Sequence, residues 1–258
     1  MTQSITNLIR FGNIVAFVIT LIINGLAGVG FLNGRTTAQV SNLYSNLVTP
    51  AGYVFAIWGI IYALLFIFII YQALPTQKDK AFQKQISGLF ILSSLFNCAW
   101  IFLWQYNFIS LSVSAILALL ATLIAIYLRL GIGFSKVSWR EKLFIHLPFS
   151  VYFGWITVAT IADVAAALVY GHWNGLSPNV WAEAMLLAAL AVTLIIVVAR
   201  RDVAYGLVIV WALVGIAANH SGNQEIVTTV EVAVAVILVA LAVSIGISRL
   251  KHKRQVAV

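Results

Sequence analysis

Apolar runs alternate with short polar links along the whole chain. Each run is close to the ~20 residues that an α-helix needs to cross a hydrocarbon core. The pattern therefore predicts an all-α integral membrane protein with about eight transmembrane helices. The runs cover residues 11–31, 52–73, 86–106, 108–130, 143–169, 180–199, 203–219 and 226–248.

Positively charged residues separate the polar links into two alternating sets. When the links are numbered alternately, one set contains a single cation, Arg35. The other 14 of the 15 Lys and Arg residues lie in the second set of links, to which both ends of the chain belong. Cationic loops are retained in the cytoplasm, so both termini are expected to be cytoplasmic. The other cations are Arg10, Lys78, Lys80, Lys84, Arg129, Lys136, Arg140, Lys142, Arg200, Arg201, Arg249, Lys251, Lys253 and Arg254.

The composition supports lipid as the solvent. Hydrophobic residues make up 62% of the chain and charged residues 9%, whereas soluble domains contain about 25% charged residues. The net charge of +8 is explained by cations that meet anionic headgroups at one membrane face. We therefore expect the lipid bilayer as a partner and no nucleic acid. The charge pattern fits a multi-pass protein of a bacterial plasma membrane.

The sequence lacks the usual marks of an enzyme or a metal site. A single cysteine, Cys98, excludes an internal disulfide and a multi-cysteine metal centre. No His-Glu-x-x-His, Gly-x-Ser-x-Gly or P-loop sequence occurs, and no nucleophile is visibly paired with a base. We expect a protein that is not an enzyme, with no catalytic residues, no metal and no required cofactor.

The character of the runs changes near Gly171. Aromatic residues are concentrated before this point, and the later runs consist mainly of Ala, Val, Leu and Ile. The change predicts a five-helix unit over residues 1–172 and a three-helix extension with a basic cytoplasmic tail over residues 173–258. Thr49-Pro50 and Ser177-Pro178 are each expected to open a helix, with the hydroxyl residue as N-cap and proline in the first turn.

Three of the predicted helices each carry, along one face, a stripe of residues suited to binding a ligand. On the second helix the spacing i, i+3, i+7 places three rings on one face, although an interfacial aromatic belt would explain this segment alone. The third helix repeats the spacing with an amide and two rings, and the fifth carries a ring, a small residue and a carboxyl at i, i+4, i+8. The stripes are Phe55, Trp58 and Tyr62; Asn97, Trp100 and Trp104; and Trp155, Ala159 and Asp163.

These segments resemble signatures of the tryptophan-rich sensory protein (TspO) and mitochondrial translocator protein family. They occur in the family's order and on helices of the right number. The resemblance covers about residues 11–170. Its segments are Pro50-Ala51-Gly52-Tyr53-Val54-Phe55-Ala56-Ile57-Trp58 through Tyr62, then Asn97-Cys98-Ala99-Trp100, then Leu147-Pro148-Phe149 with Trp155 and Ala159.

The resemblance implies a five-helix bundle whose cavity binds a flat apolar ligand, such as a porphyrin or other tetrapyrrole or a sterol. By position it suggests six of the stripe residues as the pocket lining, namely Phe55, Trp58, Asn97, Trp100, Trp155 and Ala159. The chain departs from the family in four ways. The first loop lacks Trp and Pro, and Asp163 replaces a family Asn. The spacing from Pro148 to Trp155 is longer than usual, with Tyr152 at the family's Trp offset, and the last three helices have no counterpart in the minimal fold.

Two further functions stay open at this point. Acids within membrane spans usually face the bundle interior or a watery cavity, so Asp163 would suit a small proton-coupled secondary transporter. Glu183 and Glu231 are more simply explained by their nearness to the membrane interface. The last three helices would suit an accessory subunit that docks a partner, and a homodimer is a further open prediction.

Overall fold

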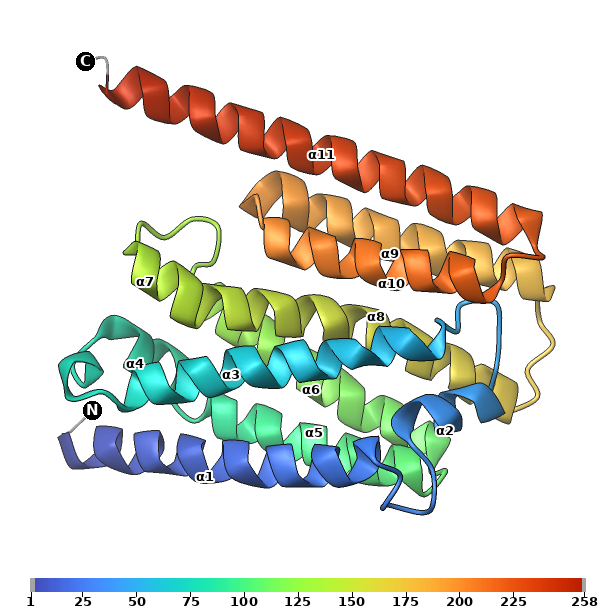
Figure 1. The fold of residues 1–258 in the computed structure, drawn as a ribbon, viewed down its shortest axis with the longest axis horizontal. Coiled ribbons are helices and arrows are strands. Elements are labelled where there is room, and N and C mark those ends of the chain that lie inside the picture. Colours follow the sequence, from blue (N-terminus) through green and yellow to red (C-terminus); the bar gives the residue numbers. More distant parts are fainter. Residues whose placement is uncertain (1–2, 257–258) are drawn as a thin grey trace.

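Eight long helices run side by side in the computed structural model, which describes the backbone of residues 3–256 and the side chains of residues 4–247 (Figure 1). Within that part of the chain no strand occurs, so the all-α prediction is confirmed. The long helices are α1 (Gln3–Gly28), α3 (Ile57–Ala73), α5 (Leu89–Gln105), α6 (Ile109–Arg129), α8 (Leu147–Tyr170), α9 (Pro178–Arg200), α10 (Val203–Asn219) and α11 (Gln224–Val256).

Within the described residues, six helical segments are long and apolar enough to cross a membrane, while α5 and α10 are shorter apolar helices. The chain is therefore a multi-pass membrane protein, and the number of eight crossings stays a prediction. Short elements complete the fold: α2 (Thr37–Leu43), a 3-10 turn η1 (Gly52–Ala56) before α3, a 3-10 turn η2 (Pro75–Gln77), α4 (Ala81–Ile86), α7 (Trp139–Glu141) and a π-helical turn η3 (Lys142–His146) that leads into α8.

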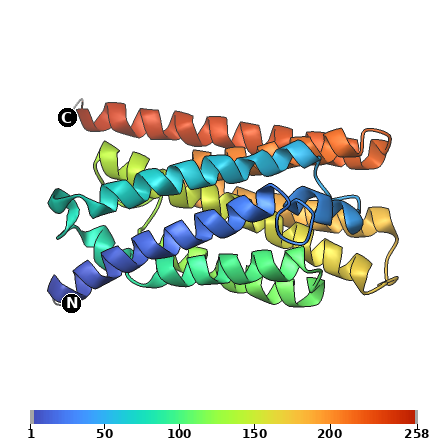
Figure 2. The same cartoon turned by 60° about the horizontal axis from the view of Figure 1, so that its bottom comes forward.

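The start of α1 and the end of α11 lie at the same end of the bundle (Figures 1 and 2). The link that carries α4, the link that carries α7 and the short α9–α10 connection lie at this end too, whereas α2 lies at the opposite end. The structure thus gathers the cation-rich links on one side, as the charge alternation predicts. Arg249, Lys251, Lys253 and Arg254 of the predicted tail lie outside the residues whose side chains are described. Which end faces the cytoplasm stays a prediction.

One of the two predicted helix starts is confirmed. The Ser177 hydroxyl accepts a hydrogen bond from the Val180 N–H and Pro178 begins α9. The prediction for Thr49-Pro50 is wrong, because the helical structure begins only at η1, with Ala51 as an N-cap that makes no side-chain bond. The Thr49 hydroxyl instead accepts a hydrogen bond from the Asn46 N–H at 3.0 Å.

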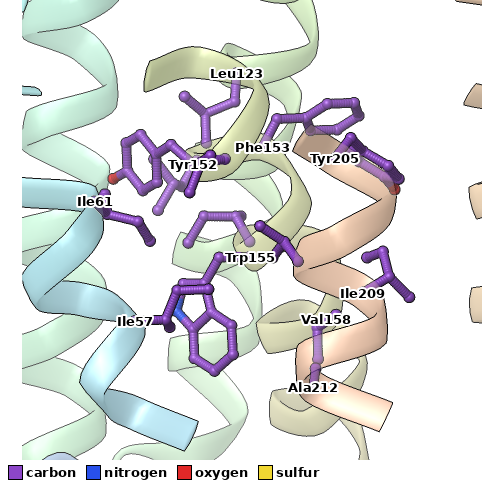
Figure 3. Close-up of a cluster of buried hydrophobic side chains, with 14 of the residues drawn as sticks. Ile57, Ile61, Leu123, Tyr152, Phe153, Trp155, Val158, Tyr205, Ile209 and Ala212 are labelled. Carbon is purple, nitrogen blue, oxygen red and sulfur yellow. The ribbon is translucent and has the colours of Figure 1, made fainter. Parts of the chain in front are cut away.

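Helix α8 lies at the centre of the bundle and is the most buried of the candidate spans. It packs against α3 on one side and α10 on the other (Figure 3). Gly154 permits the close approach to α10, since a Cβ there would lie 3.2 Å from the Tyr205 carbonyl oxygen. The Tyr205 hydroxyl also hydrogen-bonds to Thr157 Oγ1 at 3.2 Å. Small residues and interhelical hydrogen bonds are the usual means of helix association in lipid.

The C-terminal half of α10 is hydrogen-bonded to η1, across the predicted boundary between the two units. The Ala51 N–H donates to the Gly215 carbonyl at 3.0 Å, and the Trp211 indole N–H donates to the Val54 carbonyl at 3.2 Å. Gly215 has no room for a side chain, because a Cβ would lie 2.0 Å from Val54 Cγ2. The division of the chain into two units at residue 172 stays a prediction. The predicted extension is nevertheless in direct contact, through α10, with η1, the turn that precedes α3.

Gly215→Ala is expected to lower the free energy of unfolding by about 1–3 kcal/mol, because the added methyl group overpacks the α10–η1 contact. Thermal unfolding in detergent measures the change. Gly25→Ala is the matched control, since a Cβ at Gly25 meets nothing within 4 Å. Val54→Ala should restore part of the lost stability in the double variant. An unchanged melting temperature for Gly215→Ala would show that this contact is not tight.

Candidate ligand site

Trp58 lies at the centre of a cluster of aromatic rings contributed by α3, α5 and α8. Its indole stacks on Tyr62, with ring centroids 5.6 Å apart, and on Trp100, with centroids 5.8 Å apart. Tyr152 and Trp155 meet it edge to face at 6.2 and 6.1 Å. These separations and orientations are the favourable ones for aromatic pairs. The stripes of the three helices therefore face one another.

The cluster continues at both ends. Phe55 contacts Trp155 edge to face at 6.0 Å, and Trp104 stacks on Trp100 at 6.1 Å. Figure 3 shows Tyr152 and Trp155 on the side of α8 that is turned toward Ile61 and Ile57 of α3. The seven rings form one connected group.

Little empty space remains among the rings. The cavity enclosed by α3, α5 and α8 has a volume of about 30 Å³, which corresponds to a single water molecule rather than to a ligand pocket of ~300–1,000 Å³. Its lining includes seven of the nine predicted site residues, that is, all except Tyr62 and Asn97. These lining residues are Phe55, Trp58, Trp100, Trp104, Trp155, Ala159 and Asp163.

A larger groove lies on the other side of the same rings, between α1, α2 and the start of α3. Its volume is about 340 Å³, within the range of small-molecule sites. Phe55, Trp58 and Tyr62 form its aromatic wall, and Asn24 and Thr37 contribute polar atoms. Phe55 and Trp58 thus separate the small cavity from the groove.

Asn97 lines neither the small cavity nor the groove, but its hydrogen bonds join three helices around the aromatic cluster. Its side chain is fully buried. Its Oδ1 accepts a hydrogen bond from Asn24 Nδ2 at 2.6 Å, and its Nδ2 donates to the Tyr152 hydroxyl at 2.9 Å. The amide therefore joins α1, α5 and α8, which satisfies the polar groups that would otherwise be costly in lipid.

Asp163 is buried in the C-terminal half of α8 and lines the small cavity. Both of its carboxylate oxygens lie within hydrogen-bonding distance of Ser112 Oγ on α6, at 2.9 and 3.1 Å. The other two acids differ from it, since Glu183 is partly exposed and Glu231 is exposed. Asp163 is thus the acid whose position fits a role inside the bundle.

Sequence reasoning left three participants out of the site. Tyr152 lies three residues before Trp155 on the same helix, and this spacing could have included it. Asn24 is a polar residue within an apolar run, which is itself a signal in membrane helices. Ser112 gave no signal, because serine in an apolar helix usually bonds to its own backbone.

A family model described as TSPO-like protein matches residues 9–244. The chain belongs to the TSPO-like family. The match extends beyond residues 11–170, the range over which the resemblance was expected, and includes α9, α10 and most of α11. No curated protein and no solved structure matches the chain. Membership in the TSPO-like family supports a general role in ligand binding or transport within a membrane.

Asn97→Leu is expected to lower the free energy of unfolding by about 1 kcal/mol, since interhelical hydrogen bonds in membranes contribute on the order of 0.6–1.7 kcal/mol. Leucine has the branched shape of asparagine without its hydrogen-bonding groups, so Asn24 and Tyr152 lose their bonds to residue 97. Thermal unfolding in detergent measures the loss. Ser93→Ala is the control, because the Ser93 hydroxyl bonds only to the Phe90 carbonyl one turn away. Equal stability of Asn97→Leu and the parent would contradict a structural role for the amide.

Proposed function

We propose that the protein binds a flat hydrophobic ligand against the aromatic wall formed by Phe55, Trp58 and Tyr62. The observation that carries this proposal is the 340 Å³ groove beside these rings. The faces of aromatic rings stack well on planar molecules. The backing rings of α5 and α8 limit the freedom of Trp58, so the wall is preorganised for binding.

The ligand class follows from the shape of the groove and from the family resemblance. An apolar wall with a few polar atoms from Asn24 and Thr37 suits a planar molecule with a polar edge. A tetrapyrrole such as a porphyrin, or a sterol, meets this description. Binding between α3, α5 and α8 would require the rings to separate, because about 30 Å³ is free there.

We place this activity in the plasma membrane and regard it as binding, sensing or transport rather than catalysis. A homodimer and an accessory role for the last three helices are further proposals. Deletion of those helices would test the accessory role through loss of a co-purifying partner. Because α10 is bonded to η1, the truncated chain must first be shown to retain its fold.

Porphyrin titration of the purified protein should quench its Trp fluorescence with a measurable dissociation constant. Trp58→Ala is expected to weaken the affinity about tenfold or more, because the wall loses its largest ring. Trp155→Ala should have a smaller effect, since its ring supports Trp58 from behind. The dissociation constant is compared rather than the amplitude, because each variant also removes a fluorophore.

Trp139→Ala is the control for this titration. Trp139 is exposed at the opposite end of the molecule, so its loss should leave the affinity unchanged. Melting temperatures identify any variant that loses its fold. If Trp58→Ala and Trp155→Ala both bind porphyrin as tightly as the parent, the proposed wall is not the binding site.

A proton-coupled transporter is the second candidate, and the buried position of Asp163 beside Ser112 favours it. This function predicts pH-dependent uptake of the ligand into proteoliposomes. Asp163→Asn should abolish the pH dependence, because the amide cannot release a proton. Glu231→Gln is the control, since Glu231 is exposed on α11. Unchanged uptake by Asp163→Asn would exclude this role for the carboxyl group.

A further inference from the structure

A second pocket lies at the opposite, cation-rich end of the molecule and has no part in the aromatic site. Its volume is about 380 Å³. It is formed where the loop after α6, the start of α8 and the α9–α10 link meet, so it spans the boundary between the two predicted units. The polar residues that line it include Lys142, His146, Ser150, Arg200, Arg201 and Asp202.

Arg200 fixes one wall of this pocket. Its Nη1 donates to the Ile132 carbonyl at 3.2 Å, and its guanidinium lies over the Phe134 ring at 4.3 Å from the centroid. Gly133 lies directly against the end of α9, because a Cβ there would be 2.1 Å from the Arg200 carbonyl oxygen. The loop after α6 and the end of α9 therefore form a single wall of the pocket, and the Arg200 guanidinium is held in this wall.

The one carboxylate in the lining is already engaged by the protein. Asp202 accepts hydrogen bonds from the Tyr127 hydroxyl at 2.9 Å, the Ser150 hydroxyl at 2.6 Å and the Tyr205 N–H at 3.1 Å. Lys142 and Arg201 are exposed. Three cations, Lys142, Arg200 and Arg201, thus line the pocket. The carboxylate oxygens of its one acid, Asp202, already accept hydrogen bonds from the protein. The pocket therefore favours an anion.

His146 supplies an independent sign of a ligand. Its side chain is 7% exposed and lines the pocket, and its Nε2 is buried without a hydrogen-bond partner among the described residues. An unsatisfied buried polar atom calls for an explanation, such as a bound group. Six other side-chain atoms of the described residues also lack a partner, but none of their residues lines this pocket. A ligand oxygen in the pocket would complete its hydrogen bonding.

We propose that this pocket binds the phosphate group of an anionic phospholipid. Basic pockets between transmembrane helices at the cytoplasmic face are suited to such headgroups, and this one lies at the end that carries the cationic links. Lys142 and Arg201 attract the phosphate, and His146 donates a hydrogen bond from Nε2 to a phosphate oxygen. The bound headgroup then bridges α8 to the α9–α10 link and stabilises the contact between the two units.

Native mass spectrometry of the full chain in detergent, titrated with phosphatidylglycerol or phosphatidylcholine, tests the proposal. The parent is expected to retain phosphatidylglycerol preferentially. Lys142→Gln should weaken this binding about fivefold, and Lys142→Gln combined with Arg201→Gln about thirtyfold, since each cation near the surface contributes about 1 kcal/mol. His146→Leu should also weaken binding, whereas His146→Gln keeps an N–H donor and should bind better than His146→Leu.

Lys78→Gln combined with Lys84→Gln is the matched control, because both lysines lie at the same end but outside the pocket. This control should bind within twofold of the parent. Equal binding by the parent and the Lys142/Arg201 double variant would overturn the proposal, as would an equal loss in the control. Inorganic phosphate at millimolar concentration distinguishes the source. If it binds the pocket while phosphatidylglycerol does not, the lipid assignment is overturned in favour of a soluble phosphate.

Discussion

The packing of α8 between α3 and α10 is the contact on which the other features of this molecule depend. One side of α8 supplies Tyr152 and Trp155 to the aromatic cluster. The other side meets α10 at Gly154, where the backbones approach closely. Because lipid tails are as apolar as the helix surfaces, such association relies on close packing and hydrogen bonds rather than on the hydrophobic effect. A shift of α8 would therefore disturb both the aromatic cluster and the contact with the extension.

The same helix connects the two pockets. It borders the small cavity through Trp155, Ala159 and Asp163, and its start, with the preceding turn η3, borders the basic pocket through Ser150 and His146. The two sites are thus separated along one rigid element. A headgroup bound at the inner end would hold α8 and α10 in register, which in turn supports the rings that back the aromatic wall.

Several polar groups buried within the bundle find a partner on another helix. Asn97 joins α1 to α8, Asp163 bonds to α6, and Asp202 bonds to α6 and α8. Hydrocarbon offers no alternative partner, so these bonds specify which helices are neighbours. His146 Nε2 is one of the buried atoms that lack a partner among the described residues, and its side chain lines a pocket that has room for a ligand.

Much of the fold was determined by the sequence alone, for a simple reason. The thickness of a bilayer sets the length of each apolar run, and the charge of each link sets its side, so the helices and their alternation follow without tertiary information. Periodicity also placed Trp58, Trp100 and Trp155 on inward stripes. The capping of Thr49 was mispredicted, because its carbonyl is held by Asn219 and His220, which are distant in sequence.

Only the tertiary structure decided how much space those stripes leave. The rings of α3, α5 and α8 fill the hollow that their spacing suggested, and a groove of about 340 Å³ lies beside Phe55, Trp58 and Tyr62. The basic pocket likewise depends on residues 132–150 meeting residues 200–204. Volumes and long-range encounters depend on how helices cross and rotate. A one-dimensional pattern of apolar and charged residues does not contain that information.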